Sequence, residues 1–458
     1  MTIEEILAED RTNEEVIASL KEKSITVPAW ERLVRDYDPR RHPVMNRDLY
    51  PDVVDDEGRL TRVSRVTYNW QKLAAKRMTE LCFAIPVKRV YAPQNDNEKE
   101  VATVLENIFQ RNSIDSVNID RGNYLFAGCE VATLWYAVQD PNYFYGIDSK
   151  LKIRCRNYSP MNGEYLYPVF DDFGDYIALS ISYKKTRLGK TTEYFDTYTT
   201  ERHIKFQRDG DWKKVIDEKI TILKNPTLYM YRSEPIWEDS SDKVYEMEWS
   251  MSRNGNYLRK NSKPAWVVCA DDNISFGEEK DEESEFRSIL QYPQGATAKY
   301  ETWDQAIENL KFYTNEMKSS YFSSLQLPNW SYEEMKSTPM SGESRKQMFI
   351  DSQLKVIDES GKLLSFLNRE VNVVRAFLKI IMPNRTNDID ALTVKNVITP
   401  YTITDLKDTI DNLMSATAGK AIMSVPEAIH QLGISRDIDK TMQEIAADET
   451  LSIGEPTI

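Results

Sequence analysis

Apolar side chains recur every three or four residues along much of the chain, which is the spacing of a helix with one buried face. Such stretches cover 63–83, about 97–111, 236–260 and, longest of all, about 343–381. The longest stretch ends at Pro383, because proline cannot continue a helix. The apolar stripe along it consists of Leu354, Ile357, Leu364, Leu367, Val371, Val374, Leu378 and Ile381.

Residues 150–232 have a different pattern, in which β-forming side chains alternate with polar ones. Turn sequences rich in glycine and aspartate separate the runs, as at Asp172–Gly174 and Leu188–Lys190. The pattern predicts an antiparallel meander with strands at 151–155, 176–183, 192–198 and 203–207. Further short strands are expected at 265–270, 297–300 and 391–398. The mixture of long helices and antiparallel strands predicts an α+β protein.

An irregular segment with two prolines, 325–341, interrupts the helical pattern before the longest helix. The helix that precedes it is expected to start at the capping box Thr302–Gln305 and to run to about Phe322. Gly361 lies near the middle of the longest helix, where a bend costs least, and is predicted to be a hinge. Three short helices are expected to close the chain, at 405–417, 425–432 and 436–447.

Charge restricts the kinds of partner that the protein can have. Acidic residues outnumber basic ones by 73 to 59, so the 458-residue chain has a net charge of −14. A protein that grips DNA by neutralising phosphates needs a basic face. Either the partner is not nucleic acid, or DNA passes without adhering, and charge alone leaves both open. The sequence has neither a long uncharged apolar run nor the pattern of a signal peptide, so neither a membrane span nor secretion is expected.

No residue pattern predicts catalysis, a bound metal or a cofactor. The three histidines lack the spacing of metal ligands: His42, His203 and His430. Three acidic pairs could suggest a two-metal nuclease, but all lie beside turn sequences, where aspartate is common: Asp55–Asp56, Asp171–Asp172 and Asp271–Asp272. Gly189–Thr191 resembles the end of a phosphate-binding loop, but the earlier glycine and the following helix are missing. The four widely spaced cysteines are expected to be buried thiols.

Several short segments follow a particular order between residues 40 and 449. Asn69, Lys72 and Leu73 form an N-x-x-K-L helix motif, and Gly128–Leu134 leads from a glycine into a strand. Ser341–Arg345 begins the longest helix. Other segments of the series are Phe83–Val87, Asn157–Pro160, Ser424–Glu427, Gly433–Ser435 and Glu444–Glu449. In this order the chain resembles the portal proteins of tailed bacteriophages, particularly those of siphophages.

The resemblance implies a portal fold and a ring of subunits, usually twelve, around an axial channel. It divides the chain into an N-terminal arm and wing (1–235), a first stem helix (236–263), a clip (264–301), a second stem helix (302–324), a tunnel loop (325–341), the long helix (342–382), a strand that returns to the wing (383–401), and a short helical crown and tail (402–458).

The same resemblance places the functional residues. The tunnel loop is expected to face DNA with Asn329, Trp330, Tyr332, Glu333, Glu334, Met335 and Lys336. Because only Lys336 among these is basic, the loop is expected to hinder backward slipping of DNA by its shape rather than by binding phosphates. The clip is expected to meet its partners through an acidic run: Glu278, Glu279, Asp281, Glu282 and Glu283.

The expected partners are further copies of the chain, double-stranded DNA, the large terminase subunit, a head-completion or adaptor protein, the major capsid protein and a scaffolding protein. The expected location is the portal vertex of a virion assembled in the host cytoplasm. Two alternatives remain open. The chain could be another virion protein, such as an adaptor or a minor capsid protein, or a metal-dependent α+β enzyme.

Overall fold

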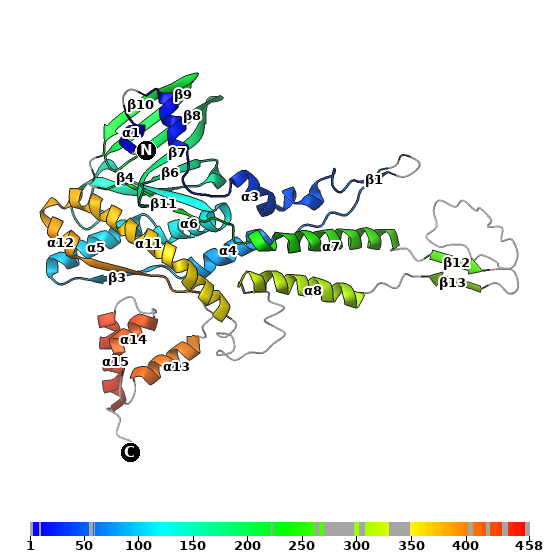
Figure 1. Ribbon diagram of the computed structural model, residues 1–458. Helices are drawn as coiled ribbons and strands as arrows, with labels where there is room; N and C mark the ends of the chain where they lie inside the picture. The colour runs from blue at the N-terminus through cyan, green and yellow to red at the C-terminus, as the bar shows by residue number, and fades with distance from the viewer. Residues whose placement is uncertain are drawn as a thin grey trace, which may run out of the picture.

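The computed structural model describes residues 3–8, 11–54, 58, 60–220, 222, 224–261, 265–269, 297–301, 307–328, 349–401, 406–417, 422–432 and 438–453. A body of helices and sheets carries two helices that project from it side by side, α7 and α8, with the strand pair β12–β13 beyond their ends (Figure 1). Helices and antiparallel sheets alternate along the chain, which confirms the predicted α+β class.

The meander predicted over 150–232 is confirmed and is larger than expected. A five-stranded antiparallel sheet has the order β10-β9-β8-β7-β6, and a three-stranded sheet has the order β11-β4-β5. Their bounds are Glu130–Asn142 (β4), Ser149–Tyr158 (β5), Tyr165–Phe170 (β6), Tyr176–Arg187 (β7), Lys190–Tyr198 (β8), Arg202–Asp209 (β9), Asp211–Lys219 (β10) and Thr227–Tyr231 (β11). Leu134 and Tyr158 of one sheet join Leu179 and Ile181 of the other in a small shared core.

The N-terminal residues fold onto the outer sheet. Helices α1 (Ile3–Ile6) and α2 (Asn13–Leu20) place their apolar side chains against Phe195, Phe206 and Trp212. Thr12 caps α2 in a reciprocal capping box with Glu15. The following arm contains α3 (Trp30–Tyr37), two short 3-10 turns and the exposed hairpin β1 (Val53–Val54) with β2 (Leu60–Thr61).

The main core lies between four helices and the inner sheet. The helices are α4 (Trp70–Phe83), α5 (Asp96–Arg111), α6 (Ile114–Gly128) and the long α11 (Ile350–Ile381). Strand β14 (Thr393–Val397) follows α12 (Thr386–Ala391) and pairs antiparallel with β3 (Lys88–Ala92). Near α11, this strand pair lies on the side of the body away from the sheets (Figure 1).

The predicted stripe of α11 is wrong in its first two turns. Leu354 and Ile357 are 56% and 62% exposed, whereas Val356, Leu363, Leu367 and Val374 are buried. Positions three or four residues apart share a helix face, so Leu354 and Ile357 lie on a different face from Val356 and Leu363. The stripe predicted from the sequence therefore combined residues from two different faces of the helix.

The projecting helices are α7 (Ser241–Asn261) and α8 (Ile307–Ser324). Strands β12 (Ala265–Cys269) and β13 (Thr297–Glu301) pair antiparallel beyond them. The last three helices are α13 (Leu406–Thr417), α14 (Val425–Leu432) and α15 (Ile438–Ile453), and α15 continues past the predicted end at 447. They lie on the far side of β3 from the sheets (Figure 1).

Candidate functional site: the supports of α7, α8 and α11

The predicted helix over 63–83 begins only at Trp70, because residues 63–69 run extended along α7. In an extended chain, every second N–H group points the same way at intervals of about 7 Å, close to the 6 Å between helix positions four residues apart. The three bonds that exploit this match are Ser64 N to Asn256 Oδ1 (2.5 Å), Val66 N to Ser252 Oγ (2.8 Å) and Tyr68 N to Glu248 Oε1 (2.7 Å). We call residues 63–69 the strap.

The strap approaches α7 at a glycine. A Cβ atom on Gly255 would lie 2.9 Å from Oγ of Ser64 and 3.1 Å from its Cβ. Both distances are shorter than a normal contact, so only glycine allows the strap to lie this close to the helix.

A buried ion pair holds the arm to the same helix. His42 Nδ1 lies 2.6 Å from Glu248 Oε1, and both side chains are fully buried. The other ring nitrogen of His42 lies 2.8 Å from the carbonyl oxygen of Asp36. Burial acts to lower the pKa of His42, but the bonds to Glu248 and to the Asp36 carbonyl raise it, and the net shift is upward. The arm is therefore fixed to α7 by a charge as well as by the strap.

The segment that follows α8 is tied down by side chains from two other helices. Three carbonyl groups within four residues, those of Leu325, Gln326 and Pro328, each accept a hydrogen bond. Their donors are Lys355 Nζ (2.7 Å) and Ser352 Oγ (3.0 Å) on α11, and Arg77 Nη1 (2.6 Å) on α4. Burial lowers the pKa of Lys355. These bonds join the residues that directly follow α8 to the first two turns of α11 and to α4, so the chain just before segment 329–348 is tied to the helix that follows it.

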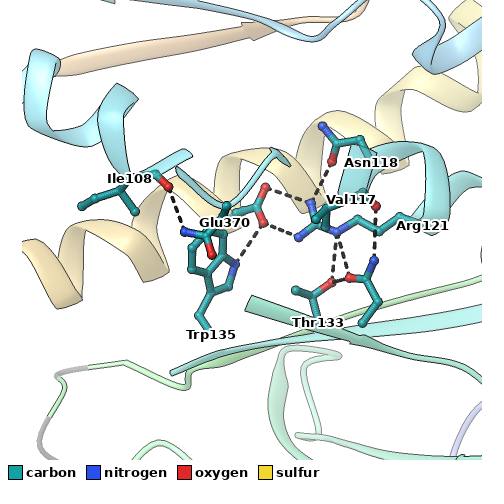
Figure 2. Close-up of polar contacts among 9 residues, drawn as sticks. Ile108, Val117, Asn118, Arg121, Thr133, Trp135 and Glu370 are labelled. Atoms are coloured by element: carbon teal, nitrogen blue, oxygen red, sulfur yellow. Dashed lines mark hydrogen bonds and ion pairs between the residues drawn. The ribbon is translucent and has the colours of Figure 1, made fainter. Parts of the chain in front are cut away.

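The body holds α11 through a buried arginine and glutamate. Arg121 on α6 donates to both carboxylate oxygens of Glu370 on α11, at 2.5 and 3.0 Å, and Trp135 Nε1 donates to the same carboxylate at 2.9 Å. Figure 2 shows the guanidinium between Glu370 and the polar side chains of Asn118 and Thr133, which it also contacts. Each of the three guanidinium nitrogens of Arg121 thus has a partner, and such a bidentate, hydrogen-bonded pair is the arrangement in which a buried charge is tolerated.

The arrangement is thus a body that holds a projecting helix pair and a long helix through buried and partly buried polar contacts. The family model described as "Phage portal protein, SPP1 Gp6-like" matches residues 23–451. The chain belongs to this portal protein family. No curated protein matches the chain.

Solved structures of gene transfer agent particles are similar to this portal family member at low identity. The "Virion of native gene transfer agent (GTA) particle" has a chain that is 11% identical, with a TM-score of 0.39 and coverage of 92% of this chain and 98% of that chain. For the "Neck of empty GTA particle computed with C6 symmetry", the values are 11%, 0.39, 87% and 95%. For the "Neck of native GTA particle computed with C12 symmetry", they are 11%, 0.39, 92% and 98%. At this similarity, they add nothing to the family assignment.

Most of the predicted portal site residues lie outside the described residues. This holds for all seven predicted tunnel-loop residues, Asn329 to Lys336, for the acidic run from Glu278 to Glu283, and for the capping box at 302–305. Gly361 is exposed within the unbroken helix α11, and a Cβ atom there would meet nothing within 4 Å. The hinge therefore remains a prediction.

The residues that support the portal helices were not identified from the sequence. Arg121 and Glu370 are 249 positions apart, and His42 and Glu248 are 206 positions apart. The available signal was a glutamate at 370 inside the apolar run of a helix, which needs a partner if it is buried. His42, whose spacing is not that of a metal ligand, is fully buried against Glu248, a contact that the sequence does not predict.

The described part of this portal protein contains no cluster of three or more histidine, cysteine, aspartate or glutamate side chains that could hold a metal. Asp171, from one of the acidic pairs, accepts the N–H groups of Phe173 and Asp175 and so stabilises its own turn. Among the same residues, no helix is long and apolar enough to cross a membrane.

Proposed function

We propose that the chain forms the ring through which double-stranded DNA enters and leaves a phage-like capsid at one vertex. The observation that carries the proposal is the convergence of α8, α11 and α4 on both ends of segment 329–348, in a chain of the portal family. A loop that resists the movement of a duplex must be anchored at both ends to a stable part of the protein. The partly buried carbonyl bonds supply such anchors, and the Arg121–Glu370 pair transmits the load to the body.

The net charge of −14 suits a conduit rather than a binder. A ring of twelve copies would carry about −170 charges, screened beyond about 8 Å at physiological salt, and would repel the polyanion that passes through it. DNA would therefore touch the predicted tunnel loop sterically, without ion pairs that slow its passage.

The test of the tunnel loop is the retention of DNA in filled heads. Trp330→Ala with Tyr332→Ala removes the two large side chains and should release DNA from heads that wild-type rings keep full. Lys336→Ala is the matched control, because it removes the only positive charge among the predicted contacts and should leave retention unchanged. Normal retention in the aromatic variant, or loss in the lysine variant alone, would contradict control by shape.

The acidic run of the predicted clip is proposed to dock the large terminase subunit, and later the head-completion protein, through basic surfaces on those partners. Charge reversal at Glu278, Glu279, Glu282 and Glu283 should abolish capture of the terminase subunit in a pull-down. The control variant reverses the charge of four exposed acidic residues in the predicted arm and wing: Glu22, Asp48, Glu201 and Glu218. Undiminished capture by the clip variant, or equal loss in both, would refute the proposed docking site.

A further inference from the structure

One strand of the inner sheet carries basic side chains at every second position. Lys150, Lys152, Arg154 and Arg156 alternate along β5 and therefore share one face. Arg156 is held by Glu164 at 2.8 Å, and Lys152 lies 3.5 Å from Asp140. Among the described residues, Lys150 and Arg154 form no salt bridge. An acidic protein thus presents a row of cations that its own carboxylates only partly neutralise.

Two members of this row, Lys152 and Arg154, also line a pocket at the end of the β4–β5 hairpin. A surface pocket of about 200 Å³ is lined by Arg111, Phe144, Tyr145, Lys152, Ile153 and Arg154, with no acidic side chain among them. Arg111 comes from the last turn of α5, so two elements bring three cations together. The cationic groups of Arg111 and Lys152 each lie 5.2 Å from the centre of the Phe144 ring, which holds them in place.

Exposed apolar side chains flank these cations. Across the strand pair, Val138 lies opposite Lys152 and Tyr136 lies opposite Arg154. Val138 is 44% exposed and Tyr136 is 38% exposed, although both lie in a strand whose earlier residues are buried. The hairpin end therefore offers exposed cations between apolar side chains, and Asp140, which lies 3.5 Å from Lys152, is the acidic side chain paired with them.

We infer that this face, which we call the β5 basic face (Arg111, Lys150, Lys152 and Arg154), binds the phosphate backbone of double-stranded DNA outside the channel. A straight row of cations with same-face spacing of about 7 Å suits a linear polyanion. Arginine presents a planar fork that matches phosphate oxygens. The choice of DNA among polyanions rests on the proposed function, since a DNA conduit meets this polymer.

The expected contact is weak and independent of sequence, because it uses only phosphates. Each phosphate contact makes the affinity fall with salt by a log–log slope of about −0.9. Replacing three cations should therefore reduce the steepness of that slope by about 2.7. The contact would hold DNA loosely near the ring without opposing its movement.

The test measures binding of a fluorescent 30-base-pair duplex to the purified full chain by anisotropy between 50 and 200 mM KCl. The triple variant Lys150→Gln, Lys152→Gln, Arg154→Gln should weaken binding at 50 mM at least tenfold and flatten the salt dependence. Arg154→Gln alone should give a smaller change in the same direction, and it serves if the triple variant does not fold. The matched control replaces three exposed lysines of another strand, β10: Lys213→Gln, Lys214→Gln and Lys219→Gln.

The inference would be supported if the wild type and the β10 control bind the duplex and the β5 variants bind it more weakly. Three results would overturn it: no binding by the wild type at 50 mM KCl, equal loss in the control, or stronger competition by poly-glutamate than by unlabelled DNA. The last result would assign the face to an acidic protein. Electron micrographs of the same samples report ring formation separately, so failure of this inference is distinguishable from failure of the proposed function.

Discussion

Removing the negative charge of Glu370 should destabilise the body more than any change to an exposed ion pair. The Glu370→Gln variant keeps the shape of the side chain but leaves the Arg121 guanidinium charged where both side chains are almost fully buried, at 2% and 1% exposure. Breaking a buried pair in this way costs about 3–5 kcal/mol. With a denaturant dependence of about 3 kcal/mol per molar urea, the unfolding midpoint of the body should fall by about 1–1.7 M.

Two comparisons separate this explanation from a general effect of substitution. Asp217→Asn breaks the exposed pair with Arg202 and should cost less than about 1 kcal/mol. The double variant Arg121→Leu with Glu370→Leu removes both charges and should lose less stability than Glu370→Gln alone, because no unpaired charge remains buried. Urea unfolding of all three variants, followed by far-ultraviolet circular dichroism, makes the measurement. A Glu370→Gln midpoint within the range of the Asp217→Asn control would refute the role assigned to the pair.

Three further changes test other parts of the fold. The pKa of His42 is raised in the folded protein, so protonation of His42 stabilises the fold fully below a pH of about 6.5. This stabilisation is lost as the pH rises through the higher pKa of the folded state. The His42→Asn variant should therefore lose more stability, measured by urea unfolding, at pH 6 than at pH 9. Gly255→Ala should cost about 1–3 kcal/mol in thermal unfolding by displacing the strap, and adding Ser64→Gly should restore much of it; no loss would contradict the close approach. Gly361→Ala should raise the unfolding free energy by about 0.5–1 kcal/mol, and it should impair DNA packaging only if α11 bends there.

Elements with a strong local pattern could be predicted from the sequence. The helix expected at 97–111 is α5, because its apolar positions all face the core and Asn95 caps its start. The four strands expected in the meander are all present, since turn residues separate them clearly. Strand β6 was missed because Pro168 interrupts its pattern, and β10 was missed because charged side chains fill its exposed positions.

Tertiary contacts decided what local patterns could not. The strap has helical apolar spacing, yet it is extended because α7 satisfies its N–H groups from successive turns. The partners of the His42–Glu248 and Arg121–Glu370 pairs are far apart in sequence, so neither pair has a local signal. The exposed Leu354 and Ile357 look like core residues in the sequence, because periodicity reports a helix but not which of its faces the body covers.

The central claim is that copies of this chain assemble around an axial opening. Electron microscopy of the purified full-length protein tests it most directly. End-on views should show a closed ring with a central hole wide enough for a DNA duplex, and side views should show projecting α7–α8 pairs on one side of the ring. A population of compact monomers without an axial opening, at every concentration and salt tried, would contradict the account.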